Sequence, residues 1–84
     1  MTDARAPLID GLATHLEVPP LTPSEIESIL ALAAVAAHGT GDRTSAPLVS
    51  FLAGMAAAQS GDRRTALDDA RRTAAELAPP PAGV

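Results

Sequence analysis

The chain is 84 residues long, contains no cysteine, and carries a formal net charge of −4, with ten acidic residues against six arginines. This length suits one domain, and the lack of cysteine excludes disulfide bridges, thiolate catalysis and thiolate metal sites. The acidic balance argues against a general nucleic-acid-binding surface, which requires an excess of basic residues.

The first predicted helix spans residues 4–17. Leu8, Leu12 and Leu16 recur at every fourth position, so they form one apolar stripe along a helix. The Val-Pro-Pro sequence at 18–20 then ends the helix, because proline cannot donate a backbone hydrogen bond to the helical ladder.

The second predicted helix runs from Pro23 to about Ala37 and stops at Gly39. Its start is well marked, because Thr22 is a suitable N-cap, proline occupies the first helical position, and Glu25 completes a capping box. Its second half is apolar at every position, so we expect this helix to be buried on most sides. Its main stripe comprises Ile26, Ile29, Leu30, Ala33 and Ala37.

The third predicted helix follows a glycine-rich loop and is capped by Thr44 or Ser45. We expect its bulky apolar side chains to enter the core, with Phe51, the single aromatic residue, at the centre. Gly54 and Ala58 form a small-residue edge that would let another helix approach closely. The bulky face comprises Leu48, Phe51, Leu52 and Met55.

The fourth predicted helix follows Gly61, is capped by Asp62, and ends before the three prolines at 79–81. Its remaining surface is charged, and opposite charges recur at helical spacing, as in Asp68 and Arg72. Its apolar stripe comprises Leu67, Ala70, Ala74 and Leu77.

Four helices joined by short loops predict an all-α fold, a small antiparallel bundle in which the central pair packs against both outer helices. We assign residues 1–78 to a single helical domain and residues 79–84 to a flexible proline-rich tail. The sequence has few large apolar side chains, so we expect a protein partner or self-association to contribute to stability. We expect no membrane span, because the longest uncharged run, 44–61, is too short, and no secretory signal, so the expected location is cytoplasmic.

The loop from His38 to Ser45 is the one concentration of reactive side chains. A helix N-terminus offers unpaired N–H groups and a partial positive charge, so His38, Arg43, Thr44 and Ser45 are candidates for binding a phosphate, a nucleotide or another oxyanion. The alternative, which we favour, is a simple connection in which Gly39 ends one helix and Ser45 caps the next. The loop is not a P-loop, because the Lys-Ser/Thr ending is missing.

No catalytic constellation emerges elsewhere, so we predict that the domain is not an enzyme. His15 and His38 would make only a weak metal pair, and we expect neither a metal nor a cofactor. Glu25 and Glu27 are two residues apart and therefore lie on different sides of a helix.

Several short segments between Ala37 and Ala58 together resemble a small helical domain of unknown function from GC-rich bacteria. The resemblance covers most of residues 5–78. That family occurs alone or fused behind nucleotidyltransferase domains of the molybdenum-cofactor guanylyltransferase type. The segments are Ala37-His38, Arg43, Ala46-Pro47-Leu48 and Phe51-Leu52-Ala53-Gly54.

The resemblance implies an accessory role near molybdenum-cofactor (molybdopterin guanine dinucleotide) biosynthesis, with a molybdenum-cofactor nucleotidyltransferase as the candidate partner. The leading hypothesis is therefore a non-catalytic helical accessory or interaction module. The alternative is a small-ligand or anion-binding module that uses the His38–Ser45 loop.

Overall fold

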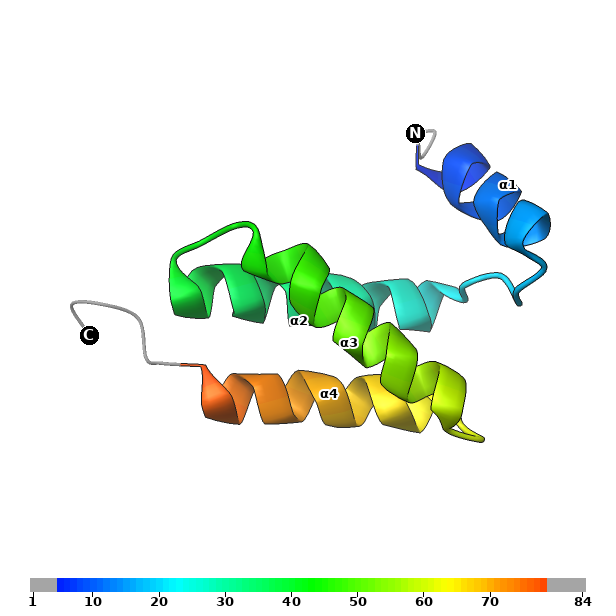
Figure 1. Cartoon of the computed structure of the whole chain (residues 1–84). Helices are drawn as coiled ribbons and strands as arrows, with labels where there is room; N and C mark the ends of the chain where they lie inside the picture. Colours follow the sequence, from blue (N-terminus) through cyan, green and yellow to red (C-terminus); the bar gives the residue numbers. More distant parts are fainter. Residues whose placement is uncertain (1–4, 79–84) are drawn as a thin grey trace.

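The computed structural model describes residues 5–78, and four helices make up most of this range (Figure 1). Residues 5–78 contain no strand, so the fold is all-α, as predicted. The residues assigned to a proline-rich tail, 79–84, lie outside the described residues. The helices are α1 (Ala6–Leu16), α2 (Pro23–Thr40), α3 (Ser45–Gln59) and α4 (Arg63–Leu77).

Two of the helices begin at the caps that the sequence predicts. The Thr22 hydroxyl accepts the backbone N–H of Glu25 at 3.2 Å, and the Glu25 carboxylate accepts the N–H of Thr22 at 2.8 Å. This reciprocal pair is the predicted capping box of α2. At the start of α4, the Asp62 carboxylate accepts the N–H of Thr65 at 3.2 Å, which confirms the second predicted cap.

Helix α2 ends about three residues later than the sequence predicts. The helix continues through Gly39 to Thr40, and the chain turns at Gly41, which has a φ of 74°. Only glycine adopts this left-handed conformation without a steric cost, so Gly41 and not Gly39 is the helix stop.

The core lies between α2, α3 and α4. The central cluster contains one buried apolar side chain from each of these helices, namely Leu32 from α2, Ala53 from α3 and Leu67 from α4. Two of the three are leucines and the third is small, so the helices pack closely around few large groups. The side chains packed around this centre are Ile29, Val49, Ala57, Ala70 and Ala74.

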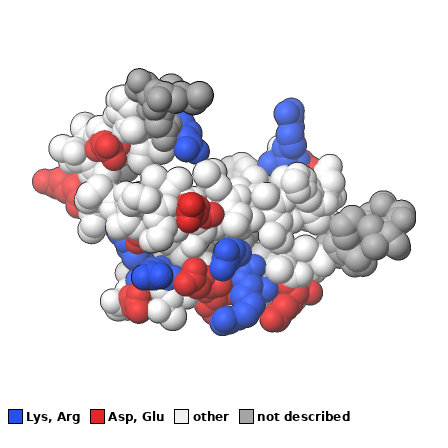
Figure 2. Space-filling model, turned by 180° about the vertical axis from the view of Figure 1, so that it is seen from behind, with Lys and Arg blue, Asp and Glu red and all other residues white. Residues whose placement is uncertain are grey.

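Helices α2 and α4 lie side by side, and α3 crosses both of them obliquely on one side (Figure 1). A hydrogen bond of 3.2 Å from the Ser28 hydroxyl to the Asp68 carboxylate joins α2 to α4. Asp68 therefore does not pair with Arg72 as its spacing suggested; Arg72 instead forms an ion pair of 2.8 Å with Asp69. Figure 2 shows that the charged side chains gather along α4, at the lower edge of the molecule.

The prediction that α3 turns its bulky side chains into the core is wrong. Phe51 is 70% exposed, and it lies on the opposite side of α3 from the buried Ala53. Because α3 is apolar all round, periodicity does not determine its inner side, and its small residues let α2 and α4 approach more closely. The other exposed bulky residues of α3 are Leu48, Leu52 and Met55, and two further predicted stripe residues, Leu30 of α2 and Leu77 of α4, are exposed as well.

Helix α1 packs against none of the other three helices and stands apart from them (Figure 1). Leu8, Leu12 and Leu16 form the predicted stripe, but each is more than half exposed. The radius of gyration is 13.7 Å, against about 12 Å for a compact domain of this length. The expected four-helix packing is therefore a three-helix core with a separate N-terminal helix. No helix within residues 5–78 is long and apolar enough to cross a membrane.

The core assignment predicts a large difference between two leucines of α2. Leu32→Ala removes a side chain that is 1% exposed, so we expect it to lower the free energy of unfolding by about 2–5 kcal/mol. Leu30→Ala is the matched control, because the same atoms are removed from a side chain that is 49% exposed. Urea unfolding followed by circular dichroism measures both; equal losses would contradict the assigned core.

Candidate functional site

An acidic side chain, Asp42, lies in the turn just before α3. The Asp42 carboxylate accepts the backbone N–H of Thr44 at 2.9 Å and the Thr44 hydroxyl at 2.7 Å. These two hydrogen bonds lower the pKa of Asp42, so it carries its negative charge at neutral pH. The charge sits where the helix end would attract a ligand anion, and the Thr44 hydroxyl is already engaged.

Of the remaining candidate residues in the loop, Ser45 is hydrogen-bonded, whereas His38 and Arg43 are exposed. The Ser45 hydroxyl lies 2.8 Å from the Thr40 hydroxyl, which in turn lies 2.8 Å from the carbonyl oxygen of Ala36. This chain of contacts joins the end of α2 to the start of α3. His38 and Arg43 are exposed on the surface. The connection differs in detail from the predicted one, since Gly41 ends α2 and no side chain caps α3. Anion binding by His38, Arg43, Thr44 and Ser45 stays a prediction.

Within residues 5–78, no three His, Cys, Asp or Glu side chains gather in a way that would hold a metal ion. The two histidines, His15 and His38, both lie exposed, one on the separate helix α1 and one near the end of α2.

The anion hypothesis is tested by thermal melting with phosphate, molybdate and nucleotides. A binding site would raise the melting temperature, and Arg43→Ala would abolish the rise. Because the Asp42 carboxylate binds Thr44 and its charge would repel an anion, we expect no rise for the wild-type chain. A rise that disappears in Arg43→Ala would contradict this expectation and establish the loop as a site.

A wide groove within residues 5–78 lies between the first half of α3 and the second half of α4, with a volume of about 630 Å³. We refer to it as the α3–α4 groove. Leu48 and Leu52 line it from α3, and Leu77 lines it from α4; all three side chains are more than 60% exposed. Alanines form most of the rest of the lining, so the groove is wide and almost wholly apolar. They are Ala36, Ala53, Ala56, Ala66, Ala70, Ala74 and Ala78.

The groove was missed at the level of sequence because its walls were assigned to the core. Leu48 and Leu52 belong to the stripe expected to face inward on α3, and Leu77 closes the predicted stripe of α4. Helix spacing places these residues on common faces, but it does not say which faces the neighbouring helices cover.

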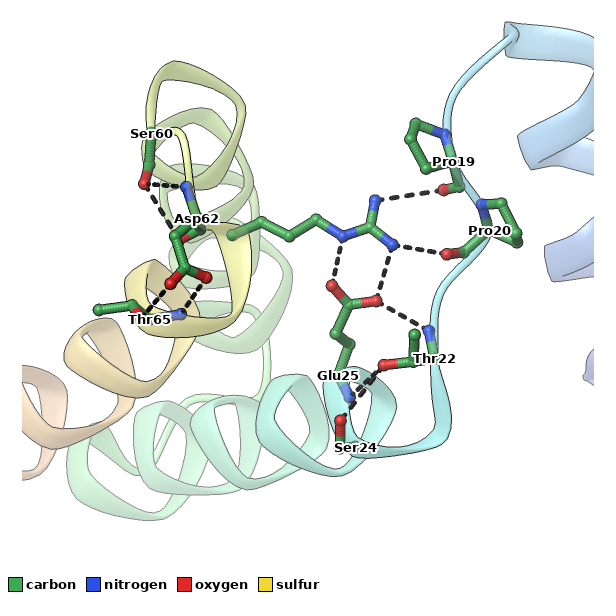
Figure 3. Close-up of polar contacts among 9 residues, drawn as sticks. Pro19, Pro20, Thr22, Ser24, Glu25, Ser60, Asp62 and Thr65 are labelled. Carbon is green, nitrogen blue, oxygen red and sulfur yellow. Dashed lines mark hydrogen bonds and ion pairs between the residues drawn. The ribbon is translucent and has the colours of Figure 1, made fainter.

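The second constellation is an ion pair that joins three segments (Figure 3). Arg63, in the first turn of α4, donates from Nε and Nη2 to the Glu25 carboxylate, the second contact measuring 2.7 Å. The same guanidinium donates to the carbonyl oxygens of Pro19, at 3.3 Å, and Pro20, at 2.5 Å. Arg63 therefore ties the start of α4 both to the start of α2 and to the segment that precedes it. We refer to these contacts as the Arg63 clamp.

Glu25 is the one charged side chain that is buried within residues 5–78, with 5% exposure. The hydrogen bonds from Arg63 hold its pKa below the ordinary value, and those from Thr22 add to this, whereas burial acts in the opposite direction. Each lone pair that faces inward is thus satisfied, as the burial of a carboxylate requires.

Sequence reasoning did not find the clamp. Glu25 was explained by the capping box, and Arg63 was counted among the exposed charges of α4. The two residues are 38 positions apart, so no helical spacing links them. The available signal was indirect: a capping glutamate next to an apolar helix can be buried, and a buried carboxylate needs a cation.

These features define a small all-α domain with an apolar groove, the Arg63 clamp and a separate N-terminal helix. Residues 3–82 match the family described as Domain of unknown function (DUF6457), and the chain belongs to this family. The match confirms the small domain of unknown function that the resemblance implied. No curated protein and no solved structure matches the chain.

The clamp predicts a defined dependence of stability on pH. The pKa of Glu25 is lower in the folded chain than its ordinary value of 4.5, so the carboxylate stabilises the fold fully above that value. This stabilisation is lost as the pH falls through the folded pKa. Glu25→Gln should therefore lower the melting temperature by several degrees at pH 7, since it removes a charged hydrogen-bond acceptor worth about 1–3 kcal/mol.

The comparison across pH isolates this group from other acids. Asp42 and Asp62 also have lowered pKa values, so both proteins lose stability in acid. The difference between wild type and Glu25→Gln should stay constant from pH 7 to about pH 5 and shrink below pH 4.5. A difference that does not change with pH would show that the Glu25 charge does not contribute.

Proposed function

We propose that this domain is a non-catalytic protein-interaction module that binds an apolar helix of a partner protein in the α3–α4 groove. The observation that carries the proposal is the groove itself, whose walls are formed by exposed Leu48, Leu52 and Leu77. Soluble domains rarely leave a contiguous apolar surface uncovered, and such surfaces commonly mark binding sites.

The shape of the groove suits a helix. Two helices form its sides, and alanine side chains leave the space between them open for larger side chains from a partner. An amphipathic helix that lays leucine-type anchors into such a space is a common mode of recognition. Asp69 and Thr73 are among the few polar residues at the groove, so the binding energy would come mainly from apolar contact.

We further propose that the partner is a molybdenum-cofactor nucleotidyltransferase and that the domain acts beside it in the cytoplasm. The support for this step is the resemblance of residues 37–58 to domains that occur fused to such enzymes. In a fused protein the chain itself holds the helical domain near the enzyme. A separate helical domain would reach the same position by binding to the enzyme.

The test is a pull-down of the tagged chain from its native lysate with identification by mass spectrometry, followed by measurement of the affinity for the recovered protein. Leu77→Asp places a charge in the wall of the groove, so we expect it to weaken binding at least tenfold. Ala75→Asp is the matched control, because it adds the same charge to an exposed position of α4 outside the groove.

The two variants give the experiment a clear negative outcome. Equal affinity of Leu77→Asp and wild type for the recovered protein would rule out the groove as the binding site. Recovery of a protein from another pathway would reject the molybdenum-cofactor partner while leaving the groove open to test.

A further inference from the structure

The outer face of α3 is an apolar surface that residues 5–78 of the same chain leave uncovered. It lies opposite the buried Ala53 and carries Phe51 and Met55 at its centre, flanked by Leu48 and Leu52. No charged residue occurs between Ser45 and Gln59. A helix that is hydrophobic all round is normally buried all round, so we expect another helix to pack on this face.

Helix α1, in turn, has an apolar side that packs on no other helix of residues 5–78. It is 11 residues long, contains Gly11 at its middle, and packs on no other helix of the chain. A helix of this length is at best marginally stable in water, so its stability depends on packing of its apolar side. Leu8, Leu12 and Leu16 present that side to solvent.

The Arg63 clamp fixes the direction in which α1 leaves the core. Both carbonyl groups that Arg63 binds belong to the consecutive prolines 19 and 20, whose φ angles are restricted by their rings. The segment between α1 and α2 is thereby held at two adjacent points against the start of α4. As a result α1 projects outward and leaves the α3 face of its own chain open (Figure 1).

We propose that α1 of one copy packs on the outer face of α3 of a second copy, and that the second copy returns the contact. Each chain supplies one projecting helix and one open face, so two reciprocal contacts satisfy both chains and close the assembly with twofold symmetry. Nothing has to be desolvated on α3 except apolar and hydroxyl or amide groups, because that helix is uncharged.

The area available is sufficient for such a pair. Seven large apolar side chains of each copy, three on α1 and four on α3, are between 47% and 74% exposed. Together they represent on the order of 500 Å² of apolar surface per copy. Full burial of these side chains in the reciprocal contact would remove about 1,000 Å² from solvent, which is the lower limit for a specific interface.

One edge of the face also admits close approach by a helix. Nothing lies within 4 Å of the position that a Cβ atom on Gly54 would occupy. Gly54 of the small-residue edge predicted from the sequence therefore has open space beside it within residues 5–78. Phe51 and Met55 do not line the α3–α4 groove, whereas Leu48 and Leu52 belong to both surfaces. Pairing through this face therefore has its own centre but shares one edge with the partner binding proposed above.

The natural absence of cysteine allows a direct test by crosslinking. Leu12→Cys on α1 and Phe51→Cys on α3 are prepared as separate single variants, mixed, and treated with a bismaleimide. We expect a crosslinked species of twice the 8.5 kDa chain mass that contains one copy of each variant. Ala34→Cys, at an exposed position of α2, replaces Phe51→Cys in the control mixture and should crosslink far less.

Three outcomes would overturn the proposal. Crosslinks between two Phe51→Cys chains in place of mixed ones would show α3 pairing with α3. An intramolecular crosslink in a Leu12→Cys/Phe51→Cys double variant that remains of single-chain mass would show α1 covering its own α3. A wild-type chain that stays monomeric by light scattering up to millimolar concentration would exclude pairing altogether.

A point variant separates pairing from folding. Leu12→Asp changes an exposed residue of α1, which packs against no other helix of its own chain. The three-helix core should therefore keep its urea midpoint at protein concentrations low enough for wild type and variant both to be monomeric. We expect the variant to be monomeric by light scattering at concentrations where the wild type is dimeric. A dimer that persists in Leu12→Asp would reject α1 as the pairing element, whereas the effect of Leu77→Asp on partner binding is judged independently.

Discussion

Arg63 connects three parts of the molecule through one guanidinium group, and much of the arrangement depends on it. The carboxylate of Glu25 completes the first turn of α2 and at the same time neutralises the arginine that begins α4. Burial of such a carboxylate without the arginine would be strongly unfavourable, so the two helix starts are fixed together. The prolines that precede α2 are drawn into the same network, and this determines where α1 can lie.

The core that this clamp supports is made largely of alanine. Leu32 and Leu67 are its deeply buried large side chains, while α3 contributes the small Ala53. Close helix packing follows from small side chains, but the gain in burial per residue is modest. The larger side chains remain outside, on the groove between α3 and α4 and on the outer face of α3. The alanine-rich composition therefore explains both the thin core and the exposed apolar surface.

Patterns within a few residues predicted the helices well. They did not predict how the helices pack, because packing depends on residues far apart in the sequence. Thr22 and Asp62 were correct as caps because a cap is decided within four residues. Phe51 was misplaced because α3 is apolar on every side, so only the neighbouring helices determine which side is buried. In the His38–Ser45 loop, Asp42 binds Thr44 in a turn that was not considered. The Arg63 clamp joins residues 38 positions apart, and no local pattern encodes such a contact.

The separation of α1 from the core also affects how the chain reaches its structure. The buried contacts join three helices within residues 23–77, which are connected by loops of a few residues. Folds with such a low contact order form in microseconds to milliseconds, since little chain entropy is lost before contacts are made. Docking of α1 on a second copy would then be a later, bimolecular event whose rate depends on protein concentration. The cellular abundance of the chain would thus set how many molecules are paired, without changing how quickly each one folds.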